Sequence, residues 1–276
     1  MNDALARLER VIAAELLYAP AHAAFGVRFV RAETGVSVAR MPVVGALEDG
    51  GRTLAAGGLL VLFDALLGSS VASALPAGSA MTTLTMHLQF TDLRHPGGEW
   101  LQGTGRRVAL DGLSALSTAE VTAADGRLVA IGSSRCVVLP DAATAPMAEP
   151  GDGQPLGELG AWRRAVVVEP VGGGARGRAR ADAGWANPRG HVQGGAVAMI
   201  AERTLHELWR PHDLDAADCF DLDITFLRAL PSDGREITCR GTLAHRGRSL
   251  GTARAEVLDA DRVVAEIGAS RYHRST

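Results

Sequence analysis

Two long apolar segments dominate the pattern of hydrophobic and polar positions along the chain. Residues 57–75 read GGLLVLFDALLGSSVASAL, and residues 194–209 read GGAVAMIAERTLHELW. Each begins at a Gly-Gly pair and carries an acid about two turns later, Asp64 and Glu202. A helix that is apolar nearly all round must be covered on most sides. The pattern therefore predicts two buried helices, each holding a carboxylate that is costly to bury unless something binds it.

Strand-like runs separated by turn residues surround both helices. We expect an amphipathic helix at 3–17 and a short helix near 156–163. The expected strands are residues 25–32, 35–42, 81–90, 99–110, 114–123 and 127–139 in the first half, and 165–171, 175–182 and those after residue 209 in the second. One helix with a run of antiparallel strands, twice over, is an α+β arrangement. Because each long helix is apolar all round, its sheet should curl around it.

The two halves repeat one another. Residues 121–135 align with residues 257–271 without a gap, 136 positions apart, and Phe90 and Phe226 have the same separation. Residues 140–158 are rich in Pro, Gly and Ala and lack periodicity, which is typical of a linker. We therefore expect one domain over 1–139, a linker over 140–158 and a second domain over 159–276. Two copies suggest a pseudo-symmetric pair, the fused equivalent of a two-fold dimer.

Composition and charge exclude several classes of protein. The formal net charge of −3 argues against nucleic acid as a partner. Three cysteines without a CxxC motif fit a reduced, cytoplasmic protein without disulfides or a zinc site. Residues 57–75 could be mistaken for a membrane span, but a charge such as Asp64 is expensive inside a bilayer. We expect no membrane segment, no metal and no cofactor.

Three literal motif matches carry no chemistry. Residues 172–177 fit GxGxxG, but an alternating strand pattern follows where the dinucleotide fingerprint needs a helix. Residues 247–251 fit GxSxG, although that motif belongs to a strand-to-helix turn of a parallel sheet, which this pattern lacks. Glu202, His206 and His212 could suggest a metal, but Pro211 breaks the helix before His212.

The second apolar helix carries the residues that suggest a family. Asn187 is followed by Gln193-Gly194-Gly195, and an acid lies nine residues after Gln193. Residues 98–101 (GEWL) and 125–130 (DGRLVA) add to the match. In these features the sequence resembles the hotdog-fold acyl-CoA thioesterases, both the phenylacetyl-CoA thioesterase-like group and the double-hotdog enzymes. The resemblance implies two tandem hotdog domains, each an antiparallel sheet wrapped around a long central helix, packed as a pseudo-dimer.

The resemblance also implies a site built across the two halves. In these enzymes an acid acts on the thioester as nucleophile or general base, and the N–H at the start of the opposite helix polarises the carbonyl. An Asn, a His or Gln, and a Ser or Thr some twenty residues after the acid complete the site. In this sequence the catalytic set would be Asp64, Thr83, Asn187, Gln193 and Gly194. Gly195 would bind substrate, and Arg246 and Arg248, in one turn, could hold the phosphates of CoA.

The opposite combination is expected to be degenerate. Glu202 would face Ala55, Ala56 and Gly57, which bring no side-chain amide, and Cys219 or Phe220 stands where a Ser or Thr is expected. The resemblance therefore implies one complete site and one that has lost its polar partners.

The expected activity is hydrolysis of an acyl-CoA to free acid and CoA. One alternative is a hotdog enoyl-CoA hydratase, whose Asp-x-Asn-Pro-x-His signature residues 185–191 (WANPRGH) match only in part. Another is a non-catalytic protein that binds acyl-CoA. The acyl group, and whether Asp64 is nucleophile or base, stay open. Any assembly beyond the chain would join pseudo-dimers through their surfaces.

Overall fold

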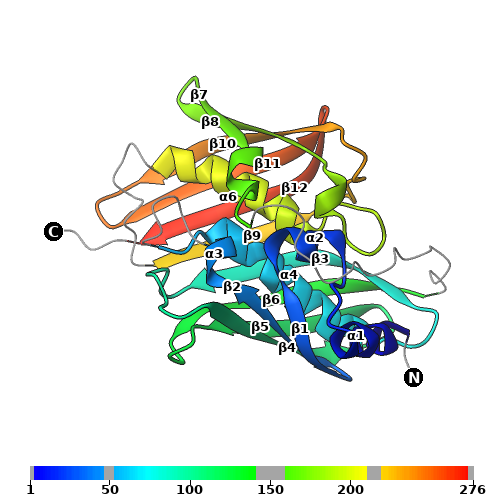
Figure 1. Ribbon diagram of the computed structural model, residues 1–276. Coiled ribbons are helices and arrows are strands. Elements are labelled where there is room, and N and C mark those ends of the chain that lie inside the picture. The colour runs from blue at the N-terminus through cyan, green and yellow to red at the C-terminus, as the bar shows by residue number, and fades with distance from the viewer. Residues whose placement is uncertain (1–2, 47–52, 141–158, 210–218, 273–276) are drawn as a thin grey trace.

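A computed structural model describes residues 3–46, 53–140, 159–209 and 219–272. Within these ranges the strands form one antiparallel sheet, in the order β1-β2-β4-β5-β6-β3-β9-β12-β11-β10-β8-β7. The first six belong to the first half of the chain and the last six to the second. Two long helices, α4 and α6, lie side by side against this sheet (Figure 1).

The first half contains one long helix and three short ones. Its elements are α1 (Asp3–Ala13), α2 (Pro20–Phe25), β1 (Arg28–Glu33), β2 (Val36–Pro42), α3 (Val43–Ala46), α4 (Ala56–Ala72), β3 (Ala80–Phe90), β4 (Trp100–Leu110), β5 (Ser114–Thr122) and β6 (Leu128–Leu139). The sequence predicted α4 and these strands to within a few residues. It missed α2, which includes Phe25, the first residue of the strand expected at 25–32. Pro20 starts that helix, and Gly26 ends it at a φ of 70° that suits glycine.

The second half repeats this order. Its elements are α5 (Trp162–Ala165), β7 (Val167–Val171), β8 (Gly174–Arg180), η1 (Ala183–Trp185), α6 (Gly194–Trp209), β9 (Cys219–Phe226), β10 (Glu236–Arg246), β11 (Leu250–Asp259) and β12 (Arg262–Tyr272). Helix α6 has the predicted bounds. Most of the expected linker, and the start of the helix expected near 156–163, lie outside the described residues.

Close approaches between backbones set the position of α4. A Cβ on Gly105 of β4 would overlap the carbonyl of Leu66 in α4, so strand and helix meet only because that position is glycine. A Cβ on Gly195 would likewise overlap the carbonyl of Leu60. The first turn of α6 therefore presses directly on the middle of α4. This contact brings the N-terminus of one helix beside the acid of the other.

The two halves of the sheet meet at β3 and β9. These strands pair antiparallel from Thr85 opposite Thr225 to Phe90 opposite Phe220. At the centre of the run His87 lies opposite Asp223, and the His87 Nδ1 and Asp223 Oδ1 atoms are 2.6 Å apart on the exposed face. No helix in the described ranges is both long enough and apolar enough to cross a membrane.

Candidate functional site

The carboxylate of Asp64 lies at the N-terminus of α6. A Cβ built on Gly194 would lie 3.3 Å from Asp64 Oδ1 and 3.4 Å from Oδ2. Burial raises the pKa of Asp64 to about 6, while hydrogen bonds from the backbone N–H groups of Gly195 and Gly194 act to lower it. The unpaired N–H groups of a helix N-terminus favour negative charge. Asp64 is thus a carboxylate that can gain or lose a proton near neutral pH.

Gln193 precedes α6 and is held by the first half of the chain. Its side chain is 4% exposed, and Nε2 lies 3.3 Å from both the Val61 carbonyl oxygen and His22 Nε2. Because the Val61 carbonyl can only accept, the amide nitrogen of Gln193 must face it. Burial lowers the pKa of His22 to about 4, so its ring is neutral and Nε2 can accept the second amide hydrogen. Val61 thereby fixes the orientation of the amide, and His22 supports it.

Asn187 and Thr83 are positioned by local backbone features. The Asn187 Oδ1 atom accepts hydrogen bonds from the N–H groups of Arg189 and His191, at 2.8 and 3.3 Å. Within the described chain, its amide hydrogens have no protein partner. Thr83 lies at an irregularity of β3 between Thr83 and Thr85, and its Oγ1 is 4.0 Å from Cys136 Sγ. Such a bulge redirects a side chain from the regular alternation of a strand.

A single cavity of about 680 Å³ joins these residues. Its wall includes all five residues that the sequence predicted to be catalytic: Asp64, Thr83, Asn187, Gln193 and Gly194. The cavity lies between the two halves of the chain, since α4 and β3 form one side and the loop before α6 forms the other. The residues of the predicted composite site therefore line one cavity.

The other acid has a different environment. Glu202 is 1% exposed, and its Oε2 would lie 2.9 Å from a Cβ on Gly57, so it faces the start of α4. Arg271 Nη2 lies 3.8 Å from Glu202 Oε1, and the guanidinium carbon is 4.5 Å from the centre of the Phe220 ring. Trp162 also packs against the position of Gly57. The space beside Glu202 is thus occupied by side chains, whereas the space beside Asp64 is part of the cavity.

The three residues that the sequence predicted to bind substrate, Gly195, Arg246 and Arg248, lie outside the cavity wall. Gly195 contacts α4 and donates its N–H to Asp64. Arg246 ends β10 and Arg248 follows in the turn to β11, and neither lines the cavity. The arginines that do line it are Arg189 and Arg228.

Sequence reasoning missed four of the residues around the cavity: Tyr18, His22, Arg189 and Arg228. Arg189 stands inside the motif from Asn187 to Gln193 and could have been found from its neighbours. His22 and Gln193 are 171 residues apart in sequence, so no local signal connects them. Tyr18 stacks on the His22 ring, with centroids 5.7 Å apart.

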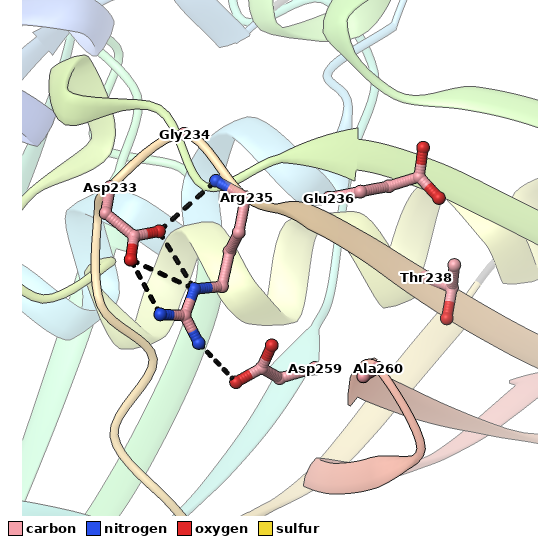
Figure 2. A pocket seen from close by; sticks show the side chains of 7 residues that line it. All are labelled: Asp233, Gly234, Arg235, Glu236, Thr238, Asp259 and Ala260. Atoms are coloured by element: carbon pink, nitrogen blue, oxygen red, sulfur yellow. Dashed lines mark hydrogen bonds and ion pairs between the residues drawn. The ribbon is translucent and has the colours of Figure 1, made fainter.

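A shallow hollow beside β10 is a surface ion cluster (Figure 2). There the guanidinium of Arg235 bridges two carboxylates, with Nη2 2.6 Å from Asp233 Oδ2 and Nη1 2.7 Å from Asp259 Oδ2. Because these charged side chains are already paired with one another, they offer a ligand few free groups to bind. In the parts of the chain that the structure describes, no group of three or more His, Cys, Asp or Glu residues is placed to hold a metal ion.

Comparison with known proteins agrees with this geometry. Residues 13–138 match the family model of the acyl-CoA thioesterase C-terminal domain, and residues 189–266 match that of the thioesterase superfamily. The fold is similar to a structure from Lactobacillus plantarum assigned as an oleoyl thioesterase (TM-score 0.59, 14% identity, covering 88% of this chain and 98% of that one). It is also similar to a thioesterase structure from Novosphingobium aromaticivorans (TM-score 0.59, 17% identity, 89% and 98% covered). No curated protein matches the sequence.

The chain has the hotdog fold of these structures. Each half of the chain matches a thioesterase family model, and the activity that these matches support is that of an acyl-CoA thioesterase, a thioester hydrolase.

Proposed function

We propose that the chain hydrolyses acyl-CoA at one composite site between its halves, here called the Asp64 site. Asp64 comes from the first half, and Asn187, Gln193 and the Gly194 N–H come from the second. The observation that carries the proposal is the position of Asp64 against the N-terminus of α6, in a cavity lined by all these residues.

The chemistry follows from that position. The thioester carbonyl oxygen would accept a hydrogen bond from the Gly194 N–H, where the helix N-terminus stabilises the negative charge that develops on it. As a general base, Asp64 takes a proton from water while the water oxygen bonds to the carbonyl carbon. The C–S bond then breaks, and the CoA sulfur leaves with a proton. As a nucleophile, Asp64 would instead bond to the carbonyl carbon while the C–S bond breaks and the CoA thiolate leaves to take a proton from solvent, and water would then hydrolyse the resulting anhydride to the free acid and Asp64.

Polar side chains around Asp64 would orient the thioester. Asn187 offers amide hydrogens that have no protein partner in the described chain, and Thr83 offers a hydroxyl from the opposite wall. Gln193 is oriented by His22 and Val61. We place the CoA phosphates near Arg189 and Arg228, which line the cavity, rather than near Arg246 and Arg248, which do not. Arginine suits phosphate because its fork donates two parallel hydrogen bonds.

We further propose that the domains at 1–139 and 159–276 form an internal pseudo-dimer. The pairing of β3 with β9 supports this, because His87 and Asp223 lie opposite each other and are 136 positions apart (223 minus 87), the offset of the sequence repeat. Under that offset the pair Met86 and Ile224 maps onto the pair Leu88 and Leu222. A two-fold relation between the halves would produce this register.

The Glu202 site, defined as Glu202 with the start of α4, is proposed to be inactive. Its acid is paired with Arg271, whose guanidinium lies against the Trp209 and Phe220 rings, and Glu202 is not among the residues that line the cavity. One active site per chain would complete the enzyme without a partner. Any homo-oligomer would then join whole chains through their outer surfaces, and dilution to single chains should preserve activity. We place the enzyme in the reducing cytoplasm, consistent with the buried free thiols of Cys136 and Cys239.

The test is release of free CoA thiol from a panel of acyl-CoAs. Turnover that is lost in Asp64→Asn and kept in Glu202→Gln would support the proposed site. Hydration of crotonyl-CoA without thiol release would indicate a hydratase, and binding by calorimetry without either reaction would indicate an acyl-CoA-binding protein. In single-turnover hydrolysis in H₂¹⁸O, label found in Asp64 would identify a nucleophile, because a general base puts the label only into the product acid. A nucleophile would put it into the product or into Asp64, depending on which anhydride carbonyl the water attacks.

A further inference from the structure

One wall of the cavity is a row of small residues on α4. Asp64 is followed along one face of the helix by Ala65, Gly68, Ser69 and Ala72, and all of them line the cavity. Residues at these spacings lie above one another on a helix. The row forms a groove that leads away from the carboxylate toward the end of α4, with Met81 of β3 on the facing side.

The equivalent face of α6 is filled. At one, four and five residues after Glu202 stand Arg203, His206 and Glu207, where α4 has alanine, glycine and serine. Arg203 and Glu207 form an ion pair at 3.9 Å across this face. The groove is therefore present on α4, which carries Asp64, and absent from α6, although the two helices are equivalent in the sequence repeat.

The two ends of the cavity differ in charge. Two arginines, Arg189 and Arg228, line the end formed by the loop before α6 and the segment after β9, whereas the lining residues beyond the groove carry no charge and include Leu75, Ala80 and Met81. Gln193, which directly precedes Gly194, also lines the cavity; it is 4% exposed, and its Oε1 has no hydrogen-bond partner in the described chain. A ligand with a charged end, a polar centre and an apolar tail fits this order.

We infer that the groove binds the acyl chain, and that the substrate class is unbranched acyl-CoA of medium length, hexanoyl to decanoyl. This inference rests on the proposed function of the Asp64 site. Eight residues separate Asp64 from Ala72, which at 1.5 Å per residue is about 12 Å of groove. That length suits a slender chain of this range, is long for an acetyl or phenylacetyl group, and is short for palmitoyl.

Two residues set the usable length. Gly68 lies one turn from Asp64, and a Cβ there would meet only the flexible end of Met81, at 3.1 Å from Cε. Ala72 lies one turn further. A larger side chain at Gly68 should therefore shorten the accepted chain more than the same side chain at Ala72. Replacing glycine inside a helix also favours the helix, by about 1 kcal/mol for alanine.

The experiment measures kcat/KM for acetyl-, hexanoyl-, decanoyl-, palmitoyl- and phenylacetyl-CoA with the full chain. The wild type should prefer hexanoyl- and decanoyl-CoA. Gly68→Leu should lose activity on both by about 10- to 200-fold, the cost of one misplaced methylene or more, and keep its rate on acetyl-CoA. Ala72→Leu should lose decanoyl-CoA alone. Gly112→Leu, in an exposed turn with open space around it, is the matched control.

Several outcomes would overturn the inference. A preference for phenylacetyl- or palmitoyl-CoA, or a chain-length profile that neither substitution changes, would place the acyl group elsewhere. If the folded Gly68→Leu protein lost the same factor of activity on every substrate, Gly68 would be a structural residue only. The smaller Gly68→Ala substitution is then measured on the same substrates, and an equal loss on all of them would likewise overturn the inference. If the wild type releases no thiol from any acyl-CoA, the proposed function itself fails, and that result is distinct from a changed profile.

Discussion

The Asp64 carboxylate of the first half touches the Gly194 backbone of the second, with both oxygens within 3.4 Å of the position of a Gly194 Cβ. The negative charge of the Asp64 carboxylate thus lies next to the partial positive charge at the N-terminus of α6. A thioester carbonyl that displaced one carboxylate contact would meet an N–H already in place. This relationship gives the following predictions their direction.

Asp64→Asn should remove the base or nucleophile while keeping the shape of the side chain. A positioned acid–base group contributes about 10²–10⁴-fold to a rate, so thiol release should fall by that factor with the fold intact by circular dichroism. The matched variant is Glu202→Gln, which should leave turnover nearly unchanged. If Glu202→Gln abolished turnover and Asp64→Asn stayed active, the pairing of the halves would be wrong.

Gln193→Ala should cost less than loss of the Gly194 hydrogen bond. A fixed oxyanion donor is worth about 2.7–4 kcal/mol, whereas a hydrogen bond that orients a substrate is worth about 0.5–1.5 kcal/mol. We expect kcat to fall by about tenfold or less. A loss in Gln193→Ala as large as in Asp64→Asn would mean that the amide takes part directly in the chemistry.

The pH dependence of kcat/KM should show the raised pKa of Asp64. Because the carboxylate form is needed in either mechanism, kcat/KM should rise as the pH increases through about 6 and level off above it. A free aspartate would give a rise near pH 4. Glu202→Gln serves as the control and should leave the profile in place, while an unchanged rise in Asp64→Asn would assign the titration to another group.

His22 should make the fold sensitive to acid. Its pKa is about 4 when folded and 6.5 as a model value. The unfolded chain thus binds a proton that the folded chain does not, and stability present above pH 6.5 is lost as the pH falls toward 4. At about 1.36 kcal/mol per pH unit, the loss approaches 3 kcal/mol. Urea unfolding at pH 7 and pH 4.5 should show it, and His22→Asn should reduce the difference between the two pH values.

Arg271 should matter for stability and not for turnover. Removing one partner of a buried ion pair typically costs about 3–5 kcal/mol, so Arg271→Ala should lower the urea midpoint clearly because it leaves Glu202 buried beside Gly57. The folded fraction should hydrolyse acyl-CoA at the wild-type rate. A selective loss of kcat in Arg271→Ala, with stability unchanged, would contradict the assignment of an inactive Glu202 site.

The sequence by itself determined the two buried helices and the order of strands, and it predicted the polar residues that we propose for the Asp64 site. Periodicity and glycine placement act over a few residues, so α4 and α6 could be read from local pattern alone. The repeat at an offset of 136 relates the two halves without any coordinates. Asp64 was conspicuous as the one acid in an apolar run, whereas Asn187 and Gln193 were expected from the resemblance to the hotdog-fold thioesterases.

The tertiary structure decided what surrounds those residues. Whether an acid has a cavity or an arginine beside it depends on side chains more than fifty positions away, as with Glu202 and Arg271. The link between His22 and Gln193 spans 171 residues and forms only when α2 packs against the loop before α6. Arg246 and Arg248 looked suitable for phosphate by composition, yet their turn lies outside the cavity wall. Local sequence fixes the chemical type of a side chain, whereas its neighbours are set by how the chain packs in three dimensions.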